Sequence, residues 1–357
     1  MLYSLARPLL FRLDPERAHR STMRALDIAH RVGLSSLIAG RSPSSQRNVM
    51  GLEFPNPVGL AAGLDKNGEH IDALGALGFG FIEIGTVTPR PQPGNPVPRM
   101  FRIAQARAII NRMGFNNAGV ERMLMNISRA RYRGILGINI GKNFDTPLER
   151  AAEDYLYCMR KAYTAASYIT VNISSPNTAN LRQLQQAGEL DGLLGALAAE
   201  RRKLADLHGK RVPLAVKIAP DLTQSDIAGM AEQFIEHDID AVIATNTTIS
   251  REGVTGLPDA DQAGGLSGAP LRVRSTNVVR HLAAALGGRL PIIAAGGILS
   301  EADAREKLAA GASLVQLYSG LIFEGPALIG KVAKALTREK APALARDDAE
   351  KLKSLSP

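Results

Sequence analysis

Short runs of β-branched and apolar residues recur along the chain, each followed by a loop and by a stretch whose apolar positions have helical spacing. The predicted strands cover residues 58–63, 81–87, 135–140, 168–173, 213–218, 241–245, 291–295 and 313–318. The predicted helices between them include 69–77, 148–165, 184–208, 225–237, 271–286 and 301–309. Eight such alternations favour a closed (β/α)8 or TIM barrel over an open doubly wound sheet. No GxGxxG motif follows the first strand, which weakens a dinucleotide-binding interpretation.

The first 40 residues have a different pattern. Apolar residues recur at helical spacing up to Leu13, and Asp14-Pro15 is a cap and first-turn pair that begins a second, amphipathic helix. Two interpretations are open: a hairpin that lies on an anionic membrane surface, and a helical pair that only caps the main domain. We favour the membrane surface, because capping does not require an excess of arginine.

These patterns divide the chain into four parts. Residues 1–40 form the amphipathic helical extension, and the Gly, Pro and Ser around 41–47 form a linker. Residues 48–340 form the barrel, and 341–357 form a polar tail. One segment of the barrel is irregular: residues 88–117 carry five prolines before two short strand patterns at 100–103 and 108–111. We expect an inserted hairpin over the barrel mouth, and insertions of this length on a βα loop often belong to a lid.

The charge is unevenly distributed. The chain of 357 residues has a net charge of +9, and residues 1–47 hold eight arginines against three acidic residues, so +5 lies in this first part. The rest carries about +4, without a basic stripe interleaved with aromatic residues. We therefore expect no nucleic-acid partner.

Cysteine and histidine usage limits the chemistry further. The single cysteine, Cys158, rules out a disulfide framework and a thiolate cluster, and we expect it to be a small buried residue. The six histidines have no metal-ligand spacing, so we predict no metal. No apolar run is long enough to span a bilayer, and the first residues lack the apolar core of a signal peptide. These features predict a protein on the cytosolic side.

Polar residues collect where the predicted strands end. The strand at 168–173 runs into a turn with two carboxamides, Asn172 and Asn177, and two hydroxyls, Ser174 and Ser175. An Asn donates two and accepts two hydrogen bonds, so a pair can bind both the C=O and the N–H of a planar amide-like ligand. Because the carboxyl ends of barrel strands meet at one pocket, we expect the other strand-end residues there as well.

A buried lysine and two glycine turns point to a phosphorylated cofactor. Lys217 lies inside an apolar strand, where an unpaired ammonium is costly, so it should meet a negative partner. Gly296-Gly297 and Gly320 follow the seventh and eighth strands, where barrels bind phosphate through backbone N–H groups. With many amides and hydroxyls and without a carboxylate pair, the pocket suits a planar anionic ligand and a flavin.

Six motifs carry a resemblance to a known family. They are Ala61-Ala62-Gly63-Leu64-Asp65-Lys66-Asn67, the run 111–117 (NRMGFNN), the run 139–143 (NIGKN), the run 171–177 (VNISSPN), the run 217–221 (KIAPD) and Gly296-Gly297-Ile298. Over essentially its full length the chain resembles the class 2, quinone-dependent dihydroorotate dehydrogenases of bacteria. The resemblance implies FMN as the prosthetic group, oxidation of dihydroorotate to orotate in pyrimidine synthesis, and a membrane quinone as electron acceptor. It also implies a peripheral position on the cytoplasmic face of the bacterial inner membrane, and we expect a monomer.

The resemblance assigns roles to individual residues. Ser175 is the implied general base; class 1 enzymes use a cysteine there, and Cys158 is too far upstream to serve. Thr178, or a water under Phe115, is our hypothesis for the onward proton relay. The implied FMN positions are Ala61, Ala62, Gly63, Lys66, Thr86, Asn139, Asn172, Lys217, Thr245, Gly268, Gly297, Tyr318 and Ser319. The implied substrate positions are Lys66, Asn111, Arg112, Met113, Gly114, Phe115, Asn172, Asn177, Asn246 and Thr247. His19 and Arg102 flank the implied quinone passage.

Two alternatives remain. A dihydrouridine-reducing flavoenzyme acting on RNA would need a basic C-terminal module and a catalytic cysteine, but residues 338–357 form only a short mixed-charge tail. A non-enzymatic scaffold at the membrane would leave Lys217 and the strand-end amides unexplained.

Overall fold

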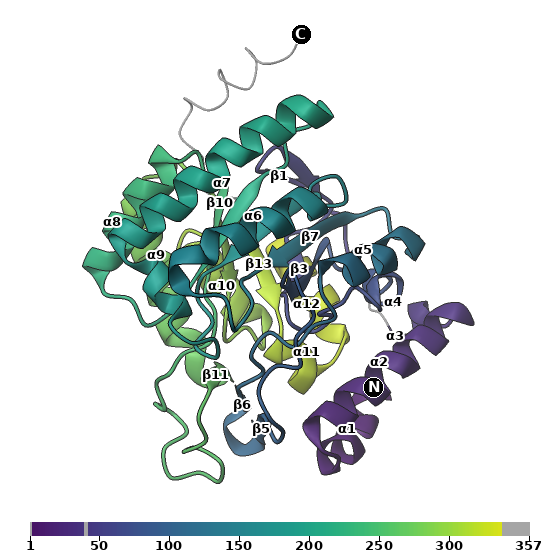
Figure 1. Ribbon diagram of the computed structural model, residues 1–357. Helices are drawn as coiled ribbons and strands as arrows, with labels where there is room; N and C mark the ends of the chain where they lie inside the picture. Colours follow the sequence, from purple (N-terminus) through teal and green to yellow (C-terminus); the bar gives the residue numbers. More distant parts are fainter. Residues whose placement is uncertain (1, 39–41, 338–357) are drawn as a thin grey trace.

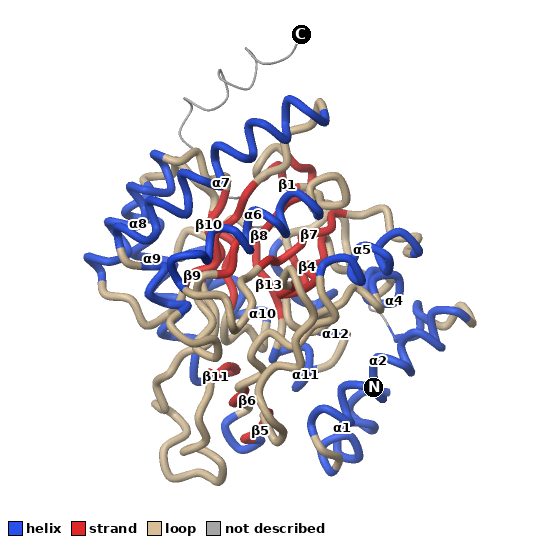
Figure 2. Tube along the Cα trace, in the orientation of Figure 1, coloured by secondary structure: helices blue, strands red, loops and turns tan. Residues whose placement is uncertain are grey.

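The computed structural model describes residues 2–38 and 42–337. Eight parallel strands close into a barrel in chain order, and helices surround it, which confirms the TIM-barrel prediction (Figure 1, Figure 2). The strands are β3 (Val58–Leu60), β4 (Phe81–Val87), β7 (Ile135–Ile140), β8 (Tyr168–Asn172), β9 (Leu214–Ile218), β10 (Ala241–Ala244), β12 (Ile292–Ala295) and β13 (Leu314–Leu317). The predicted polar tail at 341–357 lies outside the described residues, as does part of the predicted linker.

The outer helices follow the predicted windows and add three more. They are α4 (Ile71–Gly75), α5 (Val120–Arg129), α6 (Ala151–Ala162), α7 (Ala187–His208), α8 (Gln224–Glu236), α9 (Arg272–Leu286), α10 (Glu301–Ala309), α11 (Ser319–Glu324) and α12 (Ala327–Leu336). Helix α8 begins with a capping box, in which Thr223 accepts from the backbone N–H of Asp226 and the Asp226 carboxylate accepts from Thr223. The described residues also include four short 3-10 turns. They are η1 (Ala104–Ala106) between β5 and β6, η2 (Leu148–Arg150) before α6, η3 (Leu181–Gln185) before α7 and η4 (Ala269–Leu271) between β11 and α9.

The barrel strands are buried on both faces. This follows from their β-branched and apolar composition, because a parallel sheet covered by helices has no solvent face. The end of the barrel opposite the strand carboxyl termini is closed by a hairpin of β1 (Arg47–Val49) and β2 (Leu52–Phe54), which the sequence pattern did not predict. Its Val49 and Phe54 pack among the side chains of the barrel interior.

The predicted insertion forms a hairpin of β5 (Met100–Ile103) and β6 (Ala108–Asn111). A third strand that was not expected, β11 (Gly265–Gly268), pairs with β6 and makes a small antiparallel sheet. These three strands lie together at one end of the barrel, below it in Figure 2. The insertion therefore joins two loops, the one after β4 and the one after β10.

The N-terminal helices α1 (Leu2–Arg12), α2 (Pro15–Arg31) and α3 (Ser35–Ile38) lie beside this end of the barrel (Figure 1). Asp14 caps α2 by accepting from the backbone N–H of Arg17 at 2.9 Å. Helix α2 buries Ala18 and Met23. It is tied to the rest of the chain by the ion pair of Glu16 with Arg99 and by the hydrogen bond between Asp27 and His70.

Candidate functional site

An open cavity of about 1000 Å³ lies at the carboxyl ends of the barrel strands. It draws residues from seven of the eight barrel strands or the loops that follow them, which is the usual place for a site in this fold. Its lining residues include Ala61, Ala62, Gly63, Lys66, Thr86, Asn111, Met113, Gly114, Phe115, Asn172, Lys217, Thr245, Asn246, Thr247, Gly268, Gly297, Tyr318 and Ser319. All of these were expected at the site, so the fold brings together residues that lie up to 258 positions apart in the chain.

A chain of hydrogen bonds supports the floor of the cavity. Thr86 donates its hydroxyl to Asn139 Oδ1 at 2.6 Å, and Asn172 Nδ2 donates to Thr86 Oγ1 at 2.9 Å. Asn139 does not line the cavity; it lies one layer deeper and donates its amide to Glu83 at 2.8 Å. The Asn172 carboxamide is therefore oriented by Thr86, which is held in turn by the deeper residue Asn139.

Lys217 brings a cation into this floor. Its side chain is buried, and burial lowers the pKa of its ammonium while the Glu83 carboxyl group acts in the opposite direction. Within the described part of the chain, no carboxylate lies within ion-pair distance of Lys217. A lysine in this position is prepared for an anionic ligand.

Glycines allow close backbone packing at two points of the cavity lining. Gly297, after β12, has φ +72°, and a Cβ there would lie 2.3 Å from the Cα of Arg272. Gly268, on β11, has φ +97°, and a Cβ there would lie 2.2 Å from the Arg107 carbonyl oxygen. Only glycine fits these positions, and glycine turns of this kind are typical of phosphate binding by backbone N–H groups.

The residues present fit a flavin mononucleotide. Two buried side-chain atoms of the lining, Gln316 Oε1 and Thr247 Oγ1, have no hydrogen-bond partner within the described structure. Buried polar atoms are rarely left without partners, so these two await a ligand with matching donors and acceptors. Lys217 adds positive charge, and the glycine turns add a phosphate cradle.

Ser175 lies in the loop that follows β8. It is buried, and its hydroxyl oxygen accepts from the backbone N–H of Asn177 at 3.2 Å. Asn177 Nδ2 in turn donates to the Asn111 carbonyl oxygen at 3.0 Å, which joins this loop to the inserted hairpin. The predicted base and the predicted substrate amides therefore occupy neighbouring loops, although Ser175 and Asn177 do not themselves line the cavity.

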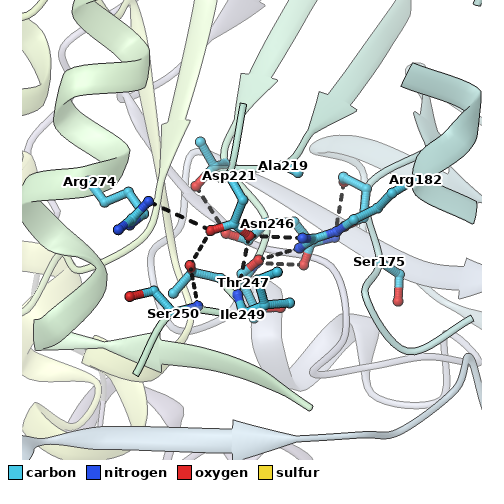
Figure 3. A network of polar contacts seen from close by, with 12 residues as sticks. Ser175, Arg182, Ala219, Asp221, Asn246, Thr247, Ile249, Ser250 and Arg274 are labelled. Atoms are coloured by element: carbon cyan, nitrogen blue, oxygen red, sulfur yellow. Dashed lines mark hydrogen bonds and ion pairs between the residues drawn. The ribbon is translucent and has the colours of Figure 1, made fainter. Parts of the chain in front are cut away.

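A polar network holds this loop against the one after β10 (Figure 3). Arg182 donates to the Ser174 carbonyl, to the Asp221 carboxylate and to the Thr247 carbonyl. Arg182 was not predicted at the site, because its partners are two backbone oxygens and an acid 39 positions away. Its neighbours in sequence carry no pattern that would single it out.

A second cavity of about 810 Å³ lies between α2 and the barrel, and it shares Gly63, Lys66, Met113 and Tyr318 with the first. Predicted residue His19 lines it. Burial, together with the nearby charges of Lys66, His70 and Arg20, lowers the pKa of His19 to about 4. Burial and then Arg99 lower the pKa of Lys66 to about 8. A histidine with a lowered pKa therefore lines the second cavity, and a lysine with a lowered pKa lines both cavities.

Two arginines with predicted roles make contacts beside the cavities. Arg102, predicted to flank the quinone passage, donates to the carbonyl oxygens of Leu10 and Phe11 at the end of α1, and its guanidinium lies 4.7 Å from the centre of the Phe11 ring. It therefore ties the inserted hairpin to the N-terminal helices. Arg112, predicted to bind substrate, donates to Gln262 and to the Pro98 carbonyl oxygen and does not line the large cavity.

Several lining residues were not expected. They are Ser267, Leu271, Ala295, Ile298 and Gln316. Gly296 and Gly320 also line the cavity, as expected from the glycine turns after strands seven and eight. Gln316 had a signal that could have been used, since it is the one polar residue in the buried run Leu314–Leu317. Ser267 lies on β11, whose place at the cavity depends on pairing with β6.

Two further observations concern the described residues alone. No helix among them is long and apolar enough to cross a membrane. No group of three or more His, Cys, Asp or Glu side chains in residues 2–38 and 42–337 has an arrangement that could hold a metal ion.

Comparison with known proteins identifies the family. Residues 44–339 match the family model described as dihydroorotate dehydrogenase. A protein of Nitrosospira multiformis named dihydroorotate dehydrogenase (quinone) is 65% identical over 94% of this chain and 96% of its own. One of Burkholderia multivorans with the same name is 63% identical over 95% of this chain and 99% of its own.

Solved structures agree. A dihydroorotate dehydrogenase of Eimeria tenella in complex with ferulenol superimposes with a TM-score of 0.83 at 39% identity, over 90% of each chain. The ligand-free form of that protein superimposes with a TM-score of 0.82. The resemblance found in the sequence motifs is confirmed, and the chain belongs to the dihydroorotate dehydrogenase family, in its quinone-dependent class.

Proposed function

We propose that the protein oxidises dihydroorotate to orotate in pyrimidine synthesis and passes the electrons to a membrane quinone. The observation that carries this proposal is the cavity itself, in which carboxamides and hydroxyls from several strands surround a buried, unpaired lysine. Family membership supports the same activity.

The substrate is bound by amides above the floor. Asn111, Asn172 and Asn246 line the cavity with both donors and acceptors, which suits the ring C=O and N–H groups of dihydroorotate. Asn177 supports Asn111 from the neighbouring loop. Lys66 and the orphan hydroxyl of Thr247 provide the charge and the donor that a carboxylate requires.

The floor of the same cavity would hold FMN, a cofactor that would supply hydride acceptance. Lys217 would contribute a positive charge to its binding, and Thr86 and Asn172 would contribute polar contacts. The turns at Gly268 and Gly297, with Ser319, would hold its phosphate.

Ser175 removes a proton from C5 of the substrate. A serine hydroxyl is a weak base at neutral pH, so its proton must be passed on. Thr178 Oγ1 is buried and has no hydrogen-bond partner within the described residues, which leaves it available for that relay. Phe115 lines the cavity and limits the access of bulk water.

The quinone approaches through the N-terminal helices. The second cavity leads from α2 to Gly63, Lys66 and Tyr318 of the first. Helix α1 exposes Leu5 and Leu9 at 75% and 65% of their surface, which suits contact with the acyl region of an anionic membrane. We place the protein at the cytoplasmic face of a bacterial inner membrane. We infer that it acts as a monomer.

Anaerobic mixing with dihydroorotate tests this function. We expect the flavin absorbance to bleach, and to return on addition of quinone but not of NAD+. A flavin that dihydroorotate leaves oxidised would contradict the substrate assignment and would turn attention to dihydrouridine in RNA. Protein purified without any flavin would contradict the enzyme assignment as a whole.

A further inference from the structure

The peptide bond between Ser174 and Ser175 is held by a single guanidinium. Arg182, on η3, donates from Nε to the Ser174 carbonyl oxygen at 3.0 Å. In the described structure, no other donor is hydrogen-bonded to this oxygen. Because the carbonyl belongs to the peptide plane that leads into Ser175, its direction sets the direction in which the Ser175 side chain leaves the backbone.

The other two donors of Arg182 reach the opposite side of the cavity mouth. One NH2 group donates to Asp221 Oδ2 at 2.8 Å and the other to the Thr247 carbonyl oxygen at 2.8 Å. Figure 3 shows Arg182 between the Ser175 loop and the loop of residues Asn246, Thr247 and Ile249. One planar group therefore spans the loop of the predicted base and the loop of the predicted substrate amides.

The two loops depend on Arg182 to different degrees. The loop after β10 has anchors of its own: Thr248 and Leu266 exchange backbone hydrogen bonds at 3.0 and 2.7 Å, and Asp221 accepts from the Ile249 N–H and the Thr248 hydroxyl. In the loop after β8, the N–H and hydroxyl of Ser174 donate to Asn172 Oδ1, the hydroxyl also accepts from Asn246, and Asn177 donates to Asn111. The Ser174 carbonyl oxygen, however, is held by Arg182. Loss of the guanidinium should disturb the base more than the substrate amides.

Asp221 explains why a charged group can be placed here. Arg182 and Asp221 are 22% and 14% exposed, and their pairing offsets the cost of burying either charge. Asp221 also lies 3.9 Å from Arg274 on its other side. A lysine could reach one of the three acceptors, but only the fork of arginine reaches them together.

We infer that Arg182 is a positioning residue for substrate oxidation, which fixes the Ser174–Ser175 peptide relative to the loop of Asn246 and Thr247. This inference rests on the proposed function, and it concerns the substrate half-reaction alone. The quinone half-reaction does not use Ser175 and should not depend on Arg182.

The test is rapid mixing of the Arg182→Ala holoenzyme with saturating dihydroorotate, with flavin bleaching as the readout. We expect bleaching to be roughly 100-fold slower, since misplacement of a reacting group by about 1 Å has an effect of this size. Orotate affinity, read from its perturbation of the flavin spectrum, should change by less than about threefold because the substrate loop keeps its own anchors. Reoxidation by quinone should be unchanged. Arg182→Lys should be intermediate, and added guanidinium should partly restore Arg182→Ala.

A double-mutant cycle separates positioning from a general structural effect. In a Ser175→Ala background, the further change Arg182→Ala should slow bleaching by less than about twofold, because the group that Arg182 positions is already absent. Multiplicative losses in the double variant would overturn the inference. So would an Arg182→Ala protein that bleaches at the wild-type rate.

Arg274→Gln is the matched control. It removes another arginine beside Asp221 without touching the Ser175 loop, and its bleaching rate should stay within about twofold of wild type. If Arg182→Ala does not retain flavin, Asp221→Asn and Arg182→Lys provide the same comparison in milder form. Wild-type protein that dihydroorotate does not bleach would refute the proposed function, whereas equal bleaching of wild type and variants would refute only the role of Arg182.

Discussion

Ser175 has no base beside it in the described structure. Its hydroxyl oxygen accepts from the Asn177 N–H, and the nearest candidate for a relay in the sequence is Thr178. The rate of proton removal should then rise with the fraction of the Ser175 hydroxyl that is deprotonated. In a variant without this hydroxyl, the rate should rise with the concentration of hydroxide.

Ser175→Ala tests this role. We expect flavin reduction by dihydroorotate to slow by at least ~100-fold at neutral pH, the usual size of a general-base contribution, with partial recovery at high pH. Cys158→Ala is the control, because Cys158 is fully buried on α6 and burial raises the pKa of its thiol. A wild-type rate in the Ser175 variant would exclude the base assignment.

Lys307 is a second buried cation that lies outside the cavity. Its ammonium donates to the Arg272 carbonyl oxygen, to the Thr276 hydroxyl at 2.7 Å and to the Ser275 hydroxyl, which in turn donates to the Gly296 carbonyl oxygen. It therefore braces the first turn of α9 beneath the predicted phosphate turn. Burial lowers the pKa of Lys307 from 10.5 to about 7, with Glu306 and Asp303 opposing the shift and Arg272 and Arg280 adding to it.

The stability of flavin-free protein should depend on pH through Lys307. Between pH 7 and 10.5 the unfolded chain keeps a proton on this lysine that the folded protein has released, so the free energy of unfolding rises with pH in this window. Lys307→Met should remove a rise on the order of 1 kcal/mol per pH unit, measured by urea unfolding at pH 7.5 and 9. Lys334→Met, at an exposed position of α12, should keep the wild-type slope. Equal slopes for all three proteins would contradict the assignment.

At the scale of elements, the N-terminal helices are bound to the barrel on one side and open on the other. Arg7 donates to the Phe323 carbonyl oxygen at 2.6 Å and Phe11 packs edge-on against Phe323, so α1 is docked on α11. The same helix leaves Leu5 and Leu9 exposed. Docking and membrane contact, which the sequence pattern presented as alternatives, can therefore use different faces of α1.

Leu5→Ser with Leu9→Ser should weaken binding to anionic lipid vesicles by about tenfold, since each exposed leucine loses part of the ~1.5–3 kcal/mol available from full burial. Reoxidation by a long-tailed quinone in vesicles should slow in parallel, while bleaching by dihydroorotate should not. Vesicle flotation and rapid mixing measure these effects.

Leu207→Ser is the matched control for the leucine pair. Leu207 is 74% exposed but lies on α7, at the other end of the molecule from α1 in Figure 1. If it weakens vesicle binding as much as the α1 substitutions do, the assigned membrane face is wrong.

At the scale of the whole molecule, Glu83 connects strands across the barrel interior. Its carboxyl group accepts from Asn139 on β7 at 2.8 Å, from Tyr168 on β8 at 2.9 Å and from Gln316 on β13 at 2.7 Å. The side chain is fully buried beneath the cavity floor. Glu83 therefore belongs to the core, and through Asn139 and Thr86 it also holds the Asn172 carboxamide in place.

Glu83→Ala should lower the free energy of unfolding by at least about 3 kcal/mol, because three buried donors lose their acceptor at roughly 1–3 kcal/mol each. Glu83→Gln should be milder, since its amide oxygen still accepts. Urea unfolding measures both, with the exposed Glu53→Ala as a control expected to stay within about 0.5 kcal/mol of wild type. If the Glu83→Ala protein were as stable as that control, the hydrogen bonds to Glu83 would make no contribution to the free energy of unfolding.

The sequence by itself determined the barrel and most of the site. Eight alternations of strand and helix favour a closed barrel over an open doubly wound sheet, and the strand-end residues converge in a barrel. Lys217, Asn172, Thr86 and Gly297 could therefore be assigned to the cavity from their positions in the chain alone. Local chemistry was also predictable, as in the Asp14 cap of α2. These features depend on residues close in the chain or on a period that repeats.

Only the tertiary structure decided which distant groups meet. The pairing of β11 with β6, the closure of the barrel end by Phe54, the turn of Arg112 away from the cavity and the three acceptors of Arg182 join segments far apart in the sequence. A single arginine or glutamate has no periodic signature, because its partners are fixed by the packing of other elements. For that reason the residues expected to bind could be named from the sequence, whereas those that hold the binding residues in place could not.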